Sequence, residues 1–531
     1  MTTHLYLFAI GPVQAFIAQA RRTQDLYMGS RMLSALAAAG ILEAQRSANF
    51  KPIFPVPQQG HAFSAQDDLK GAPHRFAFLS DDAAPHQLAK RVEGAIRGQW
   101  RTQFAQKVET WLRDRLGDGE WVEMFQRQAY DWLEFYWVAV RYESRNHAGC
   151  FKKANEALAQ RKHARFFPQI EEPRQKCTLT GIQSALPFTE HQRKRLTELV
   201  TDIVIRENER LGALALIKRL AGHPHAKCFG EGEQFKVWST TAVAYNRDAD
   251  SEELERRASE PGEGREVVGY FAVLHMDGDR MGRHLSELAS LEAHQDFSRK
   301  LSKFAAEVSK IVKKNGGEGG LLIYSGGDDV LTLLPLRHAL LCAYALYQKF
   351  NEITDLTASA GIAITPSNFP LETALQIARQ AEESAKEGYG RNAVVFTEAH
   401  GTGQLRSAGA KWEVVPFLGK LQELFQAKKI SAKLGYELQA IDHDLRAADV
   451  LEARKAEICR IAKRRTAEGV DFETEVKPTI EEMIKLVEEP YPDSSDDPKK
   501  TPKPLIPSWA DMANWAILLR FLATDPEERQ T

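Results

Sequence analysis

Two stretches of sequence decide the fold: YFAVLHMDGDRMG at residues 270–282 and YSGGDDVLTLLP at residues 324–335. Each joins an apolar run of strand length to a turn that carries carboxylates. Asp277 follows the first apolar run, and Asp328 and Asp329 lie between two further runs. Free carboxylates beside buried strands cost much solvation free energy unless a cation compensates them. The pattern therefore predicts a cation site.

The surrounding periodicity predicts a complete domain. The expected elements are a strand at residues 267–276, a helix at 284–314, strands at 320–324 and 330–334, a helix at 336–350, a strand at 357–364, a helix at 371–387 and a strand at 393–397. This order is β-α-β-β-α-β with an added helix and strand. It is the order of the ferredoxin-like unit, the framework of polymerase palms and nucleotidyl cyclases. Because one fold hosts many functions, the function has to be argued from the site.

In this fold the strand before Asp277 lies beside the GGDD hairpin, so we expect Asp277, Asp328 and Asp329 to converge as catalytic metal ligands. Carboxylate oxygens suit Mg²⁺ or Mn²⁺, which keep water and substrate phosphates in the rest of their shell. Asp279 has two possible roles, a further ligand or the cap of the following helix. Alone, GGDD would be explained as a hairpin turn; the nearby Asp277 favours the metal site.

Glycines and cations close to these acids predict binding of a nucleoside triphosphate. The residues expected to contact it are Gly278, Ser325, Gly326, Gly327, Lys386 and Arg391. Glycine lets backbone approach phosphates because it has no Cβ. Lys386 and Arg391 stand in AKEGYGRNAV (residues 385–394), where they would neutralise the β- and γ-phosphates. Basic residues at a helix C-terminus are also common through the helix dipole, but the acids favour the phosphate role.

Toward the N-terminus, the apolar run at residues 5–10 ends at Gly11-Pro12 and predicts a buried strand that leads into a helix. This place corresponds to that of Asp277 in the later strand but carries no carboxylate, which indicates a duplicated palm module without its metal site. Aromatic spacing across residues 100–142 predicts helices with little strand character.

The rest of the chain has three expected features. Residues 150–235 predict a small mixed domain that contains a helix at 209–219. The charged residues 248–265 predict an exposed connection. After residue 405 the pattern is helical, with a loop at 488–507 and a last amphipathic helix that docks back.

These elements predict an α+β fold with two ferredoxin-like palm domains, a small inserted domain and a C-terminal helical domain. The expected boundaries are a degenerate palm at residues 1–150, the small domain at 151–245, the catalytic palm at 246–405 and the helical domain at 406–531.

The composition is that of a globular chain with several domains. Its 531 residues exceed one ordinary core, and 43% hydrophobic with 27% charged residues excludes global disorder. A net charge of −2 indicates no general affinity for nucleic acid or membrane, and no apolar run reaches membrane-spanning length. Five scattered cysteines and no leader sequence predict a cytoplasmic protein. The basic clusters at Lys152-Lys153, 161–165 and 463–465 are better explained as solvated helix faces than as RNA or subunit contacts.

Seven segments, spread over most of the chain, resemble the large subunit of type III-B (Cmr) CRISPR effector complexes. In order they are IGPVQAFIAQARRTQDLYMGSRMLS (residues 10–34), KCTLTGIQSAL (176–186), ERLGALALIKR (209–219), YFAVLHMDGDRMG (270–282), YSGGDDVLTLLP (324–335), SAGIAI (359–364) and AKEGYGRNAV (385–394). The last segment also resembles its counterpart in GGDEF-type cyclases, where a Lys and an Arg hold phosphates.

The resemblance implies two palm-like domains that face each other, a small domain between them and a helical domain at the end. It implies an antiviral enzyme, activated by target RNA, that converts ATP to cyclic oligoadenylate. Asp277, Asp328 and Asp329 would bind the metals that activate a 3′-hydroxyl for attack on an α-phosphate. The implied partners are the other Cmr-type subunits, guide crRNA, target RNA and ATP, without a membrane.

Two departures from the family bear on its further activities. Many members begin with an HD nuclease domain, whereas this sequence starts at the first palm and has its one His-Asp pair, His443-Asp444, among C-terminal helices. We therefore expect the form that lacks this domain, without DNA cleavage.

The middle domain of the family often carries a C-x-x-C zinc site, but Cys177 is followed by Thr180 in the second position. A zinc site is thus not expected. A tetrahedral set of Cys177, His223, His225 and Cys228 is the chemically possible alternative.

Three other functional classes can be compared with this interpretation. A silent scaffold that binds nucleotide while holding guide and target RNA has no need for Asp277, Asp328 and Asp329 together. A freestanding dinucleotide cyclase would not need the extra palm, the inserted domain and the helical tail. Metal-dependent phosphodiester hydrolysis remains an alternative that product analysis separates.

Overall fold

The computed structural model describes residues 2–57, 62–63, 71–82, 84–164, 172, 174–199, 205, 208–223, 226–229, 237–246, 269–399, 404–444, 451–489 and 504–524. The chain forms two compact units. The first comprises residues 1–237, 280–306 and 323–327, and the second comprises 238–279, 307–322 and 328–531. The expected connection at residues 248–265 and residues 490–503 of the expected loop lie outside the described residues.

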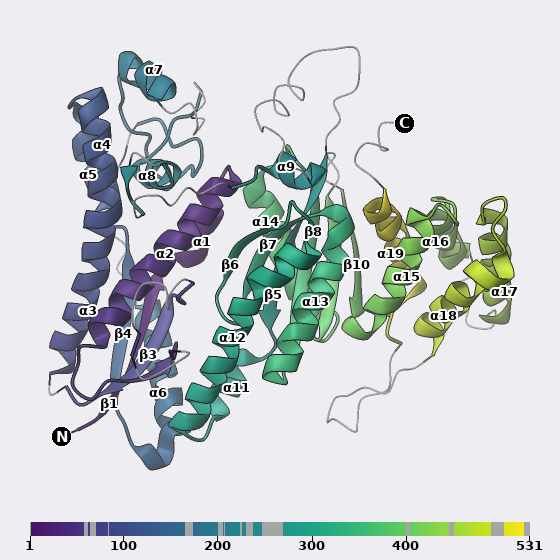
Figure 1. Cartoon of the computed structure of the whole chain (residues 1–531), viewed down its shortest axis with the longest axis horizontal. Coiled ribbons are helices and arrows are strands. Elements are labelled where there is room, and N and C mark those ends of the chain that lie inside the picture. The colour runs from purple at the N-terminus through teal and green to yellow at the C-terminus, as the bar shows by residue number, and fades with distance from the viewer. Residues whose placement is uncertain are drawn as a thin grey trace. The chain divides into compact units, whose positions relative to one another are not determined.

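The first unit is built on a four-stranded antiparallel sheet with helices packed on it (Figure 1). Its elements are β1 (His4–Gly11), α1 (Val13–Ala18), α2 (Thr23–Ala44), β2 (Lys51–Phe54), β3 (Arg75–Ser80), α3 (Pro85–Gln99), α4 (Gln106–Leu116), α5 (Glu120–Ala129), β4 (Glu134–Arg141), α6 (His147–His163), α7 (Glu190–Leu199), α8 (Ala213–Ala221) and α11 (Met281–Glu287). A π-helical turn at Trp100–Ala105 joins α3 to α4, and a 3₁₀ turn at Ser144–Asn146 precedes α6.

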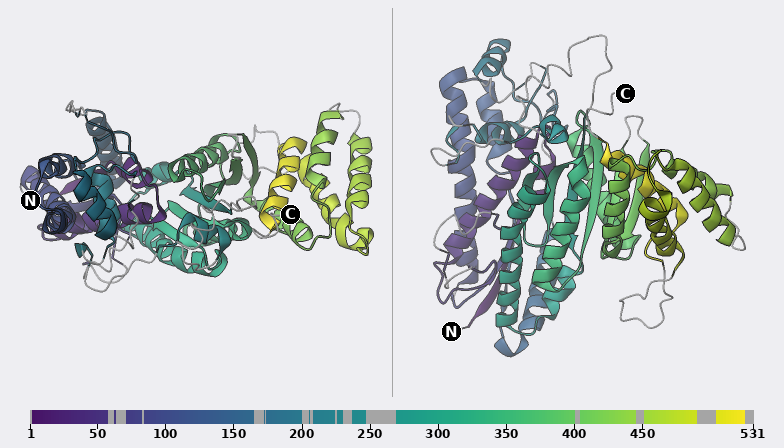
Figure 2. Two further views of the ribbon diagram at one scale, coloured as in Figure 1. Left: turned by 90° about the horizontal axis from the view of Figure 1, so that it is seen from above. Right: turned by 45° about the vertical axis from the view of Figure 1, so that its right-hand side comes forward.

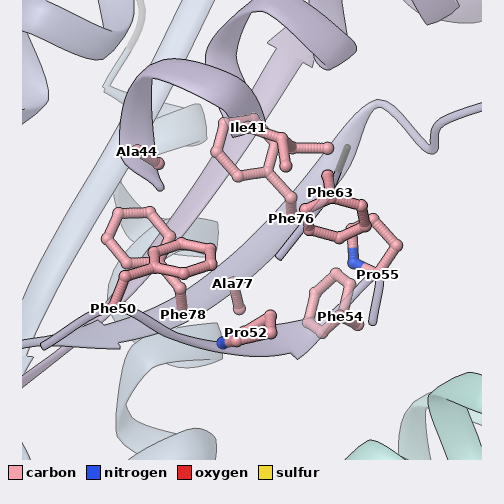
Figure 3. A pocket seen from close by; sticks show the side chains of 10 residues that line it. All are labelled: Ile41, Ala44, Phe50, Pro52, Phe54, Pro55, Phe63, Phe76, Ala77 and Phe78. Carbon is pink, nitrogen blue, oxygen red and sulfur yellow. The ribbon is translucent and has the colours of Figure 1, made fainter. Parts of the chain in front are cut away.

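The predicted strand at residues 5–10 is confirmed as β1, the best buried strand of this sheet. It is central in the order β2-β3-β1-β4, and Leu7 pairs with Ala77 on one side and with Val138 on the other. Alternate residues face two layers of helices, so a continuous apolar run is what the position requires. Beside it, α2, β2 and β3 enclose a small cavity lined only by apolar side chains (Figure 3).

The prediction of little strand character across residues 100–142 is wrong at its end. Trp111 and Trp121 lie in α4 and α5 as expected, but Phe135 and Trp137 belong to the edge strand β4. The run EFYWVAVR is rich in aromatic and β-branched residues, which favour a pleated, half-buried surface. Reading the aromatic spacing as helical missed this local preference.

The second unit contains most of the six-stranded sheet. Its elements are α9 (Thr240–Tyr245), β5 (Tyr270–Gly278), β7 (Val330–Pro335), α13 (Leu336–Thr354), β8 (Ala358–Pro366), α14 (Leu371–Glu387), β9 (Ala393–Ala399), β10 (Leu405–Lys411), α15 (Val415–Gln426), α16 (Leu434–Asp444), α17 (Leu451–Arg465), α18 (Lys477–Glu488) and α19 (Trp509–Ala523), with short 3₁₀ and π turns at Trp412–Val414 and Phe472–Val476. The helix α12 (Leu291–Asn315) and the strand β6 (Leu321–Ser325) have residues in both units.

The strand order β8-β5-β7-β6 within the sheet β10-β9-β8-β5-β7-β6 is that of the ferredoxin-like unit. The first sheet, β4-β1-β3-β2, repeats the same order. The expected α+β class with two such sheets and a helical C-terminal region is therefore confirmed.

The helices α13 and α14 cover opposite faces of this sheet (Figures 1 and 2). The approach of α14 is very close, because a Cβ added to Gly361 of β8 would lie 2.1 Å from both Ala378 O and Glu382 N. His275 of β5 pairs with Gly361 in register and so shares its face. The SAGIAI segment thus brings α14 against the end of β5.

Two further predictions of secondary structure need correction. The helix expected at 284–314 is two helices, α11 and α12, separated at residues 288–290. The purely helical region expected after residue 405 begins instead with the strand β10, which pairs with β9. The last helix does dock back, since Trp515 Nε1 of α19 donates a 3.1 Å hydrogen bond to Gly409 O of β10. Within the described residues, no helix is both long enough and apolar enough to cross a membrane.

Candidate active site

The acidic turns meet at one end of the second sheet. The strands β5 and β7 pair antiparallel with Met276 opposite Val330, so Asp277 follows the last paired residue of β5 where Asp329 precedes the first residue of β7. The carboxylates of Asp277 and Asp329 are each about a third exposed, and Asp328 is half-buried. The pairing of β5 with β7 therefore brings the three predicted acids to neighbouring positions.

A lysine from α14 reaches the first of these acids. Lys386 Nζ donates a hydrogen bond to Asp277 Oδ2, and it lies 2.5 Å from Glu382 Oε1, one helical turn away on α14. Burial lowers the pKa of Lys386, but Asp277 and Glu382 outweigh burial and raise this pKa to about 12. Lys386 is thus a fixed positive charge between two carboxylates.

The sequence analysis missed His275 and Glu382. His275 Nε2 lies 3.4 Å from Asp329 Oδ1, and His275 Nδ1 lies 3.8 Å from Glu382 Oε2. Burial lowers the pKa of His275 to about 4, so its ring is neutral at neutral pH. Burial also raises the pKa of Glu382, although Lys386 opposes this rise. The only sequence signal for Glu382 is its spacing of four residues before Lys386, which ordinary surface ion pairs share.

The electrostatics of the acids favour a bound cation. Burial raises the pKa of Asp328 to about 7, and the negative charges of Asp277 and Asp329 add to this rise. Like charges in one place disfavour ionisation, and a nearby cation reverses the effect. Lys386 compensates only part of the charge at Asp328.

Asp279 does not cap the following helix, and its carboxylate is occupied by donors of the protein. Its carboxylate is 6% exposed and accepts hydrogen bonds from Ser359 Oγ at 2.7 Å, Thr357 Oγ1 at 2.8 Å and the Asn392 amide at 2.9 Å. The helix α11 begins after Arg280 without a side-chain cap. Asp279 is therefore a structural acid that joins β5, β8 and the turn before β9.

The predicted phosphate contacts lie in or beside three turns. Gly278 is the buried last residue of β5, Ser325 is the last residue of β6, and Gly326 and Gly327 precede Asp328 in the turn after β6. Gly327 has a φ of +106°, which disfavours any residue with a Cβ. Arg391 Nη2 lies 2.8 Å from Glu387 Oε1 and stands in the turn after α14.

The acids fit a divalent cation of the expected class. Asp277, Asp328 and Asp329 offer oxygen ligands, and their mutual charge destabilises the ionised form of Asp328 until a cation is added. Across the described residues, no group of three or more His, Cys, Asp or Glu side chains is arranged to hold a metal by itself. Mg²⁺ commonly takes only one or two carboxylates and completes its shell with water and substrate phosphates.

The alternative zinc set does not assemble among its described members. Cys177 and Cys228 are buried free thiols, and burial raises the pKa of Cys228 to about 12. The ring of His223 packs 5.8 Å from that of Trp111. These three residues form no metal-holding group, and His225 lies outside the described residues.

Family models match two parts of the chain. The model for the second palm domain of Cas10/Cmr2 matches residues 270–395, and that for the N-terminal region of CRISPR-associated protein Cmr2 matches residues 5–105. The CRISPR system Cmr subunit Cmr2 of Pyrococcus furiosus is 27% identical over 259 residues, which are 41% of this chain and 29% of that protein. The chain thus spans less than a third of the length of this curated relative.

Solved structures share the fold over nearly the whole chain. The type III-B Cmr-beta complex bound to cognate target RNA contains a chain with a TM-score of 0.68 and 13% identity, covering 98% of this chain and 83% of that one. A Csm1-Csm4 cassette in complex with cA4 gives a TM-score of 0.51 and 15% identity, covering 98% and 70%. At 13–15% sequence identity, these comparisons show that the chains share a fold.

Proposed function

Since this chain is a member of the Cas10/Cmr2 family, we propose that it is the nucleotidyltransferase subunit of a type III CRISPR antiviral complex. Its reaction converts ATP to cyclic oligoadenylate when target RNA is bound. Its partners are the other Cmr-type subunits, guide crRNA and target RNA. The fold shared with a chain of the target-bound Cmr-beta complex and with the cA4-bound Csm1-Csm4 cassette supports this proposal.

One observation carries the proposal. Asp277 lies at the end of β5, Asp328 and Asp329 directly precede the paired strand β7, and Lys386 stands beside Asp277. Three acids with one compensating cation are costly to keep together at a half-buried hairpin. Binding of a metal with a polyphosphate would compensate the remaining charge.

The chain's own residues have separate tasks in this reaction. Asp277, Asp328 and Asp329 would hold Mg²⁺ or Mn²⁺, which supplies Lewis-acid activation of a hydroxyl and charge stabilisation at phosphorus. Lys386 and Arg391 bind the β- and γ-phosphates, and Gly326 and Gly327 leave room for them.

The bond changes follow from this arrangement. The 3′-hydroxyl oxygen of one ATP forms a bond to the α-phosphorus of another, and its proton passes to solvent. The bond from the α-phosphorus to the bridging oxygen breaks, and that oxygen leaves with pyrophosphate. The positive charges of Lys386 and Arg391 stabilise the leaving pyrophosphate.

The assembled complex provides the test. It is incubated with ATP, Mg²⁺ or Mn²⁺ and matched target RNA, and the products are identified by mass spectrometry. The variant Asp328→Ala/Asp329→Ala is compared with wild type, and non-matching RNA is the control. We expect oligoadenylate only with matched RNA and only from wild type.

Two outcomes would overturn the proposal. A complex that binds target RNA but forms no adenylate product with either metal would be the scaffold that holds guide and target RNA. Products of phosphodiester hydrolysis that disappear in the variant would assign the acids to a nuclease.

A further inference from the structure

The turn between α14 and β9 is held in an unusual backbone conformation. Gly390, Arg391 and Asn392 have consecutive positive φ angles of 71°, 65° and 49°. For residues with a Cβ this region is disfavoured, so surrounding contacts have to maintain it. Because Arg391 lies within the turn and Lys386 in the last helical turn of α14 just before it, the conformation of the turn decides where Arg391 points relative to Lys386.

Two contacts from the sheet hold the far side of this turn. Lys411 Nζ of β10 donates hydrogen bonds to Gly390 O at 3.2 Å and to Arg391 O at 2.5 Å. The Asn392 amide donates to Asp279 Oδ2 at 2.9 Å. Neither contact reaches the first half of the turn, where the chain leaves α14.

The C-terminal helix holds that first half through Tyr389. The Tyr389 hydroxyl donates a 2.7 Å hydrogen bond to Asp511 Oδ1, in the first turn of α19. Burial raises the pKa of Tyr389, and the hydrogen bond to the charged Asp511 adds to the rise. The other oxygen of Asp511 accepts a 2.6 Å hydrogen bond from Ser508 Oγ, which fixes the carboxylate.

The tyrosine ring is held as firmly as its hydroxyl. A Cβ added to Gly409 would lie 2.3 Å from the Tyr389 ring, so the ring rests directly on the backbone of β10. The Gly409 carbonyl in turn accepts the hydrogen bond from Trp515 of α19. The ring also packs against the apolar cluster that contains Ala385 and Val395, and Val395 is the residue of β9 that pairs with Gly409. The position of α19 is therefore coupled to the position of Tyr389.

We propose that Tyr389 and Asp511 are positioning residues through which α19 sets the phosphate-binding geometry of Lys386 and Arg391. This inference rests on the proposed function for its substrate, ATP. Linkage requires the converse as well: ATP bound by the turn stabilises the docking of α19.

The first test measures the coupling without nucleotide. Amide hydrogen exchange in the full chain is followed for residues 386–392 and 509–515 in wild type, Tyr389→Phe, Asp511→Ala and Asp511→Asn. We expect faster exchange of the turn in Tyr389→Phe and Asp511→Ala, and near-normal exchange in Asp511→Asn, which keeps an acceptor oxygen. The control is Tyr270→Phe, which keeps the ring that packs 4.9 Å from Phe521 at the other end of α19.

The second test measures affinity for Mg·ATP by calorimetry on the same variants. Tyr389→Phe and Asp511→Ala should each weaken binding about 10-fold, and the double variant should be no weaker, because both remove one contact. Asp511→Asn and Tyr270→Phe should bind like wild type. After binding, exchange of 509–515 should slow in wild type but not in Tyr389→Phe.

The outcomes separate the two proposals. Unchanged exchange of the turn in Asp511→Ala, or additive losses of affinity in the double variant, would overturn the positioning role. Failure of the wild type to bind Mg·ATP both as the full chain and in the target-bound complex would overturn the proposed function, while the exchange measurement would still decide whether α19 holds the turn.

Discussion

The carboxylate of Asp279 accepts a 2.9 Å hydrogen bond from the backbone amide of Asn392, which joins the end of β5 to the turn before β9. Asp277, two residues earlier, pairs instead with Lys386. Residues two apart in a strand point to the same face, but β5 ends at Gly278, so Asp279 lies beyond the strand and reaches other partners than Asp277. One short motif thus supplies one acid for structure and another for the site.

Substitution of Asp279 should therefore affect stability, whereas substitution of Asp277 should affect product formation. Asp279→Ala should lower the free energy of unfolding by about 3 kcal/mol, because it leaves buried donors without an acceptor. Asp277→Asn keeps the shape and should leave the unfolding midpoint close to that of wild type, while product formation falls about 100-fold. Urea unfolding and product analysis check the two expectations. Equal loss of stability in both variants would assign Asp277 to structure as well.

Glu382 should matter through Lys386. Glu382→Gln keeps the size of the side chain but removes the charge 2.5 Å from Lys386 Nζ, so the pKa of Lys386 should fall from its raised value. With Asp277 as its only close acid, Lys386 should turn further toward Asp277 and away from phosphate. We expect affinity for Mg·ATP to fall about 10-fold, since a misplaced cation costs much of its contribution. The control is Glu383→Gln, an exposed neighbour on the same helix. Equal affinity of both variants would contradict this role.

The difference between Asp277 and Glu382 shows what the sequence could predict. Asp277 follows a continuous apolar run and precedes glycine, so its place at a strand end is visible from local pattern alone. Glu382 is one of several acids on an amphipathic helix, and its burial depends on how closely α14 approaches β8. That approach is set by Gly361, on a different element. Local patterns contain no information about such distances.

The same reason explains the errors in secondary structure. The strand β5 is buried on both faces and therefore has a strong signal. The edge strands β4 and β10 have weak ones, because β4 is half-exposed throughout and β10 contains the small residues SAGA. Gly409 is small because the Tyr389 ring lies on it, which only the folded chain makes apparent.

Gly361 should be intolerant of any side chain. In Gly361→Ala the new methyl group would lie 2.1 Å from two backbone atoms of α14, which cannot move without shifting the helix. We expect a loss of about 3 kcal/mol in the free energy of unfolding. Gly419→Ala is the matched control, because Gly419 lies in α15 with no atom within 4 Å of an added Cβ. It should stabilise the chain by up to about 1 kcal/mol, since alanine favours a helix. Unfolding curves that moved in the same direction would refute the close approach of α14.

A buried histidine pair in the first unit should make stability depend on pH. His147 Nε2 lies 3.2 Å from His294 Nδ1, and both rings are fully buried. Burial lowers the pKa of His147, and it lowers that of His294 to about 3. Nearby charges have smaller effects: Glu292 raises the pKa of His147, whereas His147 and, to a smaller extent, His284 lower the pKa of His294.

The direction of the effect follows from where the protons bind. Below the ordinary histidine pKa near 6.5, the unfolded chain takes up protons that the folded pair excludes. The contribution of the pair to the free energy of unfolding is therefore fully present above that pH and is lost as the pH falls. The slope of the free energy of unfolding against pH should be about 1.4 kcal/mol per pH unit for each excluded proton. His294→Phe keeps the aromatic contacts with Phe54 and Phe151 and should reduce the slope between pH 6 and 4, whatever its stability at pH 7.5. His163→Gln, at an exposed position, should keep the wild-type slope. Urea unfolding at stepped pH measures it, and a wild-type slope in His294→Phe would mean that this ring does not exclude a proton.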